Sequence, residues 1–75
     1  MAQLDLEKIK QRRLEKDKSL LYMSGKLGFK NASTYLKYER GDYSFDANML
    51  PILAEELECN IEYFFTQKVA EIEIE

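Results

Sequence analysis

The sequence has no histidine and only one cysteine, Cys59. A lone cysteine cannot form a disulfide within the chain, and without histidine there is no Cys/His metal site and no His-based catalytic triad. We therefore expect a protein that is not an enzyme and that has no cofactor, metal or small-molecule ligand. Because no second cysteine is available to resolve an oxidised thiol, Cys59 is interpreted as a small buried apolar residue.

Long apolar runs are also missing. No stretch approaches the roughly 18 residues needed to cross a bilayer, and the N-terminal sequence lacks the apolar segment of a secretion signal. The sequence therefore predicts a cytoplasmic protein without membrane contact. One proline and three glycines give no reason to expect disorder, and 45% apolar and 33% charged residues are typical of a folded domain.

Charge is distributed unevenly along the chain. Residues 1–40 carry ten Lys or Arg and five Asp or Glu, whereas residues 41–75 carry one and nine. The first part is therefore +5 and the second −8, although the whole chain is only −3. A basic N-terminal part suits phosphate contact, and an acidic C-terminal part would face away from DNA. The alternative is that solvated helix faces merely happen to differ in charge.

Hydrophobic periodicity predicts an all-α fold with five helices. They are expected at about residues 5–17, 20–27, 32–40, 49–59 and 61–65. The expected N-caps of the last four are Ser19, Asn31, Asn48 (or Asp46) and Asn60. Gly28 and Gly41 are placed to end the second and third helices.

The second and third expected helices form a helix-turn-helix pattern between Ser19 and Gly41. The second helix of such a unit can enter the major groove of duplex DNA. Ser24 supplies the small side chain that two closely crossing helices need. In the third helix Tyr35 and Tyr38 share the inner face. Its outer face carries Ala32, Ser33, Leu36, Lys37 and Arg40.

Residues 69–75 change to a period of two, in which Ala70, Ile72 and Ile74 alternate with glutamates. This pattern favours a strand. No other part of the chain is predicted as its partner, so pairing with the same strand of a second subunit is expected; the alternative is a frayed acidic tail. We accordingly divide the chain into a helix-turn-helix domain at residues 1–66 and an acidic C-terminal segment at residues 67–75.

Three short motifs follow one another in a fixed order: Leu27-Gly28, then Glu39-Arg40-Gly41, then Leu53-Ala54 with Leu57. Together with Ile9-Lys-Gln-Arg-Arg-Leu-Glu and the closing Asn60-Ile61-Glu62-Tyr63-Phe64-Phe65, they resemble the Cro and phage-repressor (Xre-type) DNA-binding domains over about residues 6–65. The resemblance implies a compact five-helix, lambda-repressor-like domain that binds operator DNA, usually as a dimer, and regulates transcription.

The resemblance also implies roles for particular residues. It pairs Arg13 with Glu39 in a structural ion pair. Base-contacting positions carry over to Lys30, Asn31, Ala32, Ser33, Leu36 and Lys37. Phosphate contact carries over to Arg12, Lys16, Ser19, Arg40 and Tyr43. The sequence departs from the family at Leu20, where members often have a phosphate-binding Gln, and the turn after Gly28 is one residue longer than the commonest form.

The sequence therefore predicts a sequence-specific regulator that binds a double-stranded DNA operator, of the phage or mobile-element repressor type and acting as a homodimer. The alternative is a helix-turn-helix protein-interaction module without DNA binding, such as an anti-repressor or an antitoxin-like protein. That module would use Leu21, Tyr22, Leu36 and the Ile72–Ile74 strand. For Leu36 a further alternative is packing against a neighbouring subunit or the loop at Tyr43.

Overall fold

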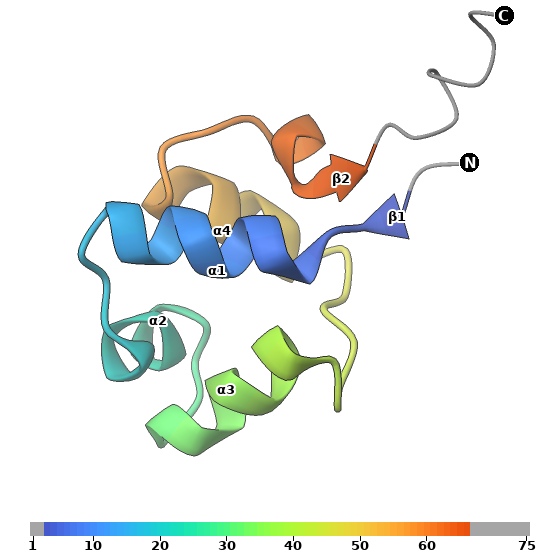
Figure 1. Ribbon diagram of the computed structural model, residues 1–75. Helices are drawn as coiled ribbons and strands as arrows, with labels where there is room; N and C mark the ends of the chain where they lie inside the picture. The colour runs from blue at the N-terminus through green and yellow to red at the C-terminus, as the bar shows by residue number, and fades with distance from the viewer. Residues whose placement is uncertain (1–2, 67–75) are drawn as a thin grey trace, which may run out of the picture.

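The structure is a computed structural model and describes residues 3–66. This part of the chain contains four α-helices, one 3-10 helix and a two-stranded ladder (Figure 1). The elements are β1 (Gln3–Leu4), α1 (Leu6–Glu15), α2 (Leu20–Lys26), α3 (Ala32–Arg40), α4 (Met49–Glu56), the 3-10 helix η1 (Ile61–Phe64) and β2 (Phe65–Thr66). The predicted all-α class is confirmed in outline, but the count of five α-helices is not, because the last expected helix is a single 3-10 turn.

Side chains at the helix ends explain where α1 and α2 begin. The Asp5 carboxylate accepts hydrogen bonds from the backbone N–H groups of Glu7 (3.1 Å) and Lys8 (3.4 Å), which caps α1. Ser19 Oγ accepts the N–H of Tyr22 at 2.9 Å, as predicted for the cap of α2. Helix α1 ends at Glu15, earlier than expected, and Asp17 in the turn that follows has a φ of 57°.

Three expected caps are wrong in their chemistry. Asn31, Asn48 and Asn60 stand at the N-cap positions of α3, α4 and η1, but none of their side chains caps the helix. Asp46 does so for α4, because its Oδ1 accepts the N–H groups of Asn48 (3.0 Å) and Met49 (3.2 Å).

The core is built from every helix. Its fully buried members are Ile9, Met23, Tyr35, Leu53, Leu57 and Phe64. Tyr35 therefore points inward as predicted, while Tyr38 is half-buried against the same core. Cys59 was expected to be buried; it is only partly buried, packed against the core beside Ile61 and the end of α4.

The ladder was not predicted from the sequence. Gln3 pairs with Thr66 and Leu4 with Phe65, antiparallel, and the Asp5 N–H donates to Phe64 O at 2.6 Å. The start of α1 is thereby joined to the end of η1 (Figure 1). The predicted strand with Ala70, Ile72 and Ile74 lies outside the described residues, so its pairing remains a prediction.

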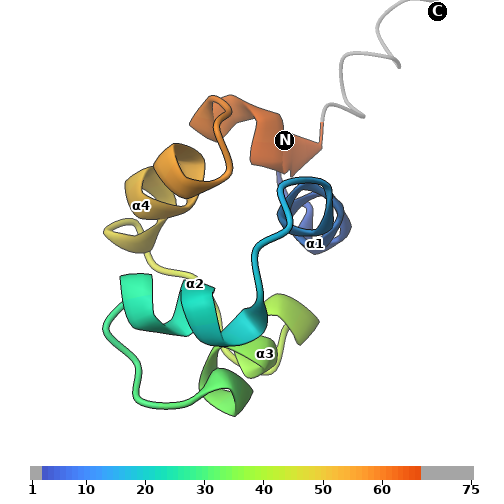
Figure 2. The ribbon, with the colours of Figure 1, turned by 90° about the vertical axis from the view of Figure 1, so that its left-hand side faces the viewer.

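Seen along α1, the helices divide into two groups (Figure 2). Helices α2 and α3 pack against each other below α1 and α4, and η1 lies above them. Ser24 is completely buried, and its Oγ donates to the backbone oxygen of Asn31 at 2.8 Å, which ties α2 to the entrance of α3. Ser24, the small residue predicted where α2 and α3 cross closely, thus also forms a hydrogen bond to the residue before α3.

Candidate nucleic-acid interface

A buried ion pair fixes α3 to α1. Arg13 Nε donates to Glu39 Oε2 at 2.9 Å and Nη2 to Oε1 at 3.0 Å, and Nη1 donates to the backbone oxygen of Lys18 at 3.0 Å. The hydrogen bond with Glu39 raises the pKa of Arg13, so the guanidinium stays charged. Burial raises the pKa of the neighbouring Tyr35, which keeps that phenol neutral. The pair that the resemblance implied is therefore present, and it sets the orientation of α3.

With its inner face held in this way, α3 turns three side chains outward. Ser33, Lys37 and Arg40 are exposed, and α3 lies at the edge of the molecule (Figure 1). Lys30 and Asn31, in the turn that leads into the helix, are exposed as well. These five residues form what we call the α3 surface.

Ala32 and Leu36 do not share this exposure. Both are partly buried, and Leu36 lines an open hollow of about 600 Å³ between α1 and α3 together with Leu6 and Lys10. Asp42, in the loop that contains Tyr43, lines the same hollow, and the alternative that Leu36 packs against a neighbouring subunit stays a prediction. Ala32 and Leu36, two of the six expected base-contacting residues, thus lie at the margin of the α3 surface.

The polar groups at the start of α3 bond to one another. Asn31 Oδ1 accepts the hydroxyl groups of Ser33 (3.1 Å) and Thr34 (2.9 Å). The positive end of the helix dipole favours the amide oxygen on this side. The amide nitrogen of Asn31 remains available as a donor, while Lys30 and Lys37 add two further cationic donors.

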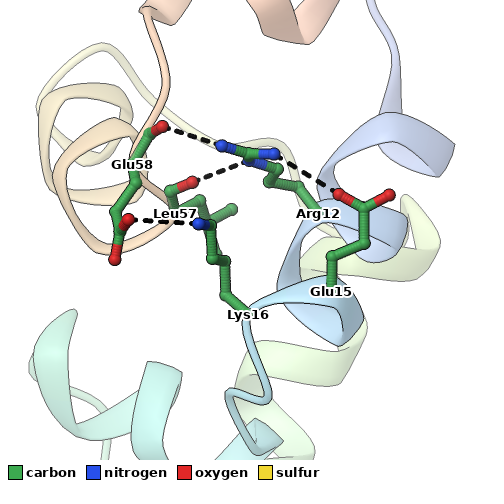
Figure 3. Close-up of polar contacts among 5 residues, drawn as sticks. All are labelled: Arg12, Glu15, Lys16, Leu57 and Glu58. Atoms are coloured by element: carbon green, nitrogen blue, oxygen red, sulfur yellow. Dashed lines mark hydrogen bonds and ion pairs between the residues drawn. The ribbon is translucent and has the colours of Figure 1, made fainter.

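Arg12 and Lys16 bind α4 instead of joining the α3 surface (Figure 3). Arg12 Nε donates to Leu57 O at 2.8 Å and Nη2 to Glu58 O at 2.9 Å, and Lys16 Nζ lies 3.1 Å from Glu58 Oε1. Arg12 Nη1 also lies 3.4 Å from Glu15. Cations are favourable at the carbonyl end of a helix, which explains the arrangement. The phosphate role expected for Arg12 and Lys16 stays a prediction, and it would require both side chains to leave these partners when DNA binds.

The other residues expected to contact phosphate are exposed. Ser19 retains its hydroxyl hydrogen after capping α2, and Tyr43 lies in the loop after α3. Arg40 Nη2 lies 2.6 Å from Asp42 Oδ2, but this pair is solvent-exposed, so its guanidinium can exchange partners at little cost.

Of the ten basic residues within residues 3–66, four form ion pairs and six do not. Ion pairs among residues 3–66 occupy Arg12, Arg13, Lys16 and Arg40. Within the same range the remaining basic residues form no ion pair: Lys8, Lys10, Lys18, Lys26, Lys30 and Lys37. The sequence analysis did not predict that Lys10 lies beside the α3 surface. Its position three residues before Arg13 places both side chains on one face of α1, and this spacing was the signal that could have indicated it.

A family model for the helix-turn-helix matches residues 9–64, which cover α1 from Ile9 onward, all of α2 to α4, and η1. The chain belongs to the helix-turn-helix family of the Cro and C1 type. This is a family of DNA-binding regulatory domains. No curated protein and no solved structure gives a match to the chain.

Two further findings concern residues 3–66 alone. None of the helices there has the length and apolar character that a membrane span requires. The same residues contain no group of three or more Cys, Asp or Glu side chains arranged to hold a metal ion.

Proposed function

We propose that this helix-turn-helix protein is a sequence-specific transcriptional regulator that inserts α3 into the major groove of duplex DNA. The observation that carries the proposal is the exposure of Ser33 and Lys37 on a helix whose opposite face is locked by the Arg13–Glu39 pair. A helix that reads DNA must expose side chains to the base edges, and it must hold them at a fixed angle. The exposure of Ser33 and Lys37 meets the first condition, and the Arg13–Glu39 pair meets the second.

Within the proposal the residues divide by the kind of contact they offer. Lys37, Lys30 and the Asn31 amide are donors suited to guanine O6 and N7, and Ser33 suits several base edges. Ala32 and Leu36 contribute from the margin. Ser19, Arg40 and Tyr43 bind phosphate, which positions the helix without reading sequence. Arg12 and Lys16 are left out of the phosphate set because Leu57 and Glu58, just after α4, hold their side chains, which are less exposed than that of Arg40.

We further propose a homodimer that represses transcription by occupying its operator. The support is the alternating Ala70, Ile72 and Ile74 pattern, which favours strand pairing between two copies. Two-fold symmetry then requires a roughly palindromic operator with half-sites about 34 Å apart. Ile72→Asp should yield a monomer in sedimentation, whereas Glu73→Gln on the opposite face should remain a dimer.

Selection of bound fragments from a random duplex pool, followed by a salt titration, tests the function. The selected sites should share a palindrome, and the logarithm of the affinity should fall linearly with the logarithm of the salt concentration as counterions are released. A protein that binds neither selected nor random duplex at low salt overturns the proposal.

One observation favours the second candidate, a protein-interaction module. Leu21 is 63% exposed on α2, next to the exposed Tyr22, whose hydroxyl donates to Glu56 Oε1 at 2.7 Å. A module of this kind should bind no duplex even at low salt, and Leu21→Asp should abolish its binding to the protein partner. Duplex binding in the wild type that is lost in Leu21→Asp, without unfolding, would instead place Leu21 at the DNA.

A further inference from the structure

Four aromatic side chains connect the turn before α3 to the loop after it. Phe29 stacks on Tyr38 with ring centroids 5.0 Å apart and an interplanar angle of 10°. Tyr38 in turn meets Tyr43 edge-on at 5.3 Å and Phe45 at 5.4 Å. Such pairs stabilise a defined geometry beyond simple burial of apolar area. The ring of Tyr43 is therefore held in place, although the residue is 48% exposed.

The backbone fixes the same loop. Gly41 takes a φ of 96°, and the N–H groups of Asp42 and Tyr43 donate to the backbone oxygen of Lys37 at 2.8 and 3.3 Å. The main chain of Lys37 thus sets the position of Tyr43. In return the Lys37 Nζ lies 5.7 Å from the centroid of the Tyr43 ring.

This contact matters because no ion pair within residues 3–66 holds the Lys37 ammonium. Of the two basic residues of α3, Arg40 is paired with Asp42, whereas no carboxylate within residues 3–66 forms an ion pair with Lys37. A lysine side chain has four rotatable bonds and loses that freedom when it binds a base. The electron-rich face of a tyrosine ring favours the rotamers that keep the ammonium close to it.

We propose that Tyr43 is a positioning residue for Lys37, which limits where the ammonium meets a guanine and so sharpens base discrimination. The assignment rests on the proposed function and adds to it, because Tyr43 then contributes to sequence reading through its ring as well as to phosphate binding through its hydroxyl. Tyr43→Phe distinguishes the two contributions, because it keeps the ring that contacts Lys37 and removes only the hydroxyl that would bind phosphate.

The test uses the full chain and duplexes taken from the random-pool selection. Substituting each base pair in turn identifies a position at which Lys37→Ala discriminates less strongly than the wild-type protein but still measurably. At that position Tyr43→Leu should reduce the ratio of best to other base pairs about two- to fivefold, the effect of losing an exposed cation–π contact. Tyr43→Phe should keep the ratio, while its affinity for all duplexes falls alike. In the Lys37→Ala background Tyr43→Leu should change the ratio no further.

A DNA-free measurement accompanies this series. The ring current of Tyr43 should shift the side-chain methylene protons of Lys37 upfield in the NMR spectrum of the free protein, and Tyr43→Leu should remove the shift. Tyr43→Met replaces Tyr43→Leu if the latter unfolds. Tyr63→Leu is the matched control: it removes a similar contact, with Lys8 Nζ 5.3 Å from the ring centroid, on a different helix, and should leave the base ratio unchanged.

Several results would overturn the role of Tyr43. The first is a base-pair ratio in Tyr43→Leu equal to that of the wild type. The second is that Tyr43→Leu lowers this ratio as much in the Lys37→Ala background as in the wild type. The third is that Tyr43→Phe lowers the ratio as much as Tyr43→Leu does. Duplex binding with no base discrimination anywhere would also refute it, while leaving DNA binding in place. A protein that binds no duplex fails at the earlier step, the proposed function, and the NMR shift then reports the side-chain contact alone.

Discussion

Arg13 of α1 holds Glu39 of α3 at two points, with N–O distances of 2.9 and 3.0 Å, and the two side chains are only 9% and 2% exposed. Removing one partner leaves the other charge buried without compensation. Arg13→Ala or Glu39→Ala should therefore reduce the free energy of unfolding by about 3–5 kcal/mol, measured by urea denaturation.

The exposed pair of Arg40 with Asp42 is the control for this prediction, because its side chains are 58% and 49% exposed. Arg40→Ala should change the free energy of unfolding by about 0–1 kcal/mol. If Arg13→Ala and Arg40→Ala lower the free energy of unfolding by similar amounts, burial of the ion pair does not determine how much stability its removal costs.

Arg12 should matter for stability through hydrogen bonds to the end of α4. Its guanidinium bridges Leu57 O and Glu58 O, a reach that a single ammonium cannot reproduce (Figure 3). We expect Arg12→Ala to cost about 1–2 kcal/mol of unfolding free energy, at the low end for charged hydrogen bonds because the group is partly exposed. Arg12→Lys keeps the charge and should recover less than half of the loss; full recovery would mean that charge alone suffices.

Arg12 and Arg13 also show how far the sequence could predict the site. The two residues are adjacent, but consecutive helix positions point about 100° apart, so one side chain reaches α4 and the other α3. A count of basic residues cannot predict which of the two arginines contacts which element. Their partners, Leu57 O for Arg12 and Glu39 for Arg13, come from segments more than 25 residues away. The bounds of α3, in contrast, were predicted correctly: Gly41 ends the helix as expected, and Asn31 occupies the N-cap position although its side chain bonds no helix N–H group.

Other elements lay beyond sequence reasoning for physical reasons. The sequence after Asn60 predicted an α-helix, but β2 begins at Phe65, so Ile61–Phe64 has room only for a 3-10 turn. Strands of two residues carry no detectable periodicity, which explains why the β1–β2 ladder was missed. Helix α4 ends at Glu56, because Glu58 adopts a φ of 57° where Arg12 binds its carbonyl group.

The pH dependence of the Glu58 contact has a defined sign. The hydrogen bond from Lys16 lowers the pKa of Glu58 below its ordinary value of 4.5. A carboxyl group whose pKa is lower in the folded state stabilises the fold above its unfolded pKa, and this stabilisation is lost as the pH falls through the folded value. In Lys16→Ala the pKa of Glu58, followed by NMR titration, should rise towards 4.5. Lys10→Ala, on the side of α1 facing α3, should leave it unchanged.

Gly41 should be the least replaceable glycine. Its φ of 96° is unfavourable for any side chain, and a Cβ there would lie 3.3 Å from Leu6 Cδ1. Gly41→Ala should cost about 1–2 kcal/mol of unfolding free energy. Gly25 is the matched control: it lies in α2, where an added methyl group would meet nothing within 4 Å, so Gly25→Ala should stabilise by about 0.5–1 kcal/mol. Thermal denaturation of the two variants should therefore shift in opposite directions.

Lys37 and Lys16 should differ in how they affect DNA binding, because one ammonium is exposed on α3 and the other is held by Glu58. Lys37→Ala should reduce discrimination at one base pair by about 1–3 kcal/mol, the value of a good bidentate contact. Lys16→Ala should leave both the base preference and the salt dependence close to wild type, since a cation already paired with a carboxylate releases no counterion from DNA. Affinity measured on the selected and on random duplex at several salt concentrations separates the two effects. A shallower salt dependence in Lys16→Ala would mean that Lys16 leaves Glu58 for a phosphate when DNA binds, and the contact in Figure 3 would then belong to the free protein only.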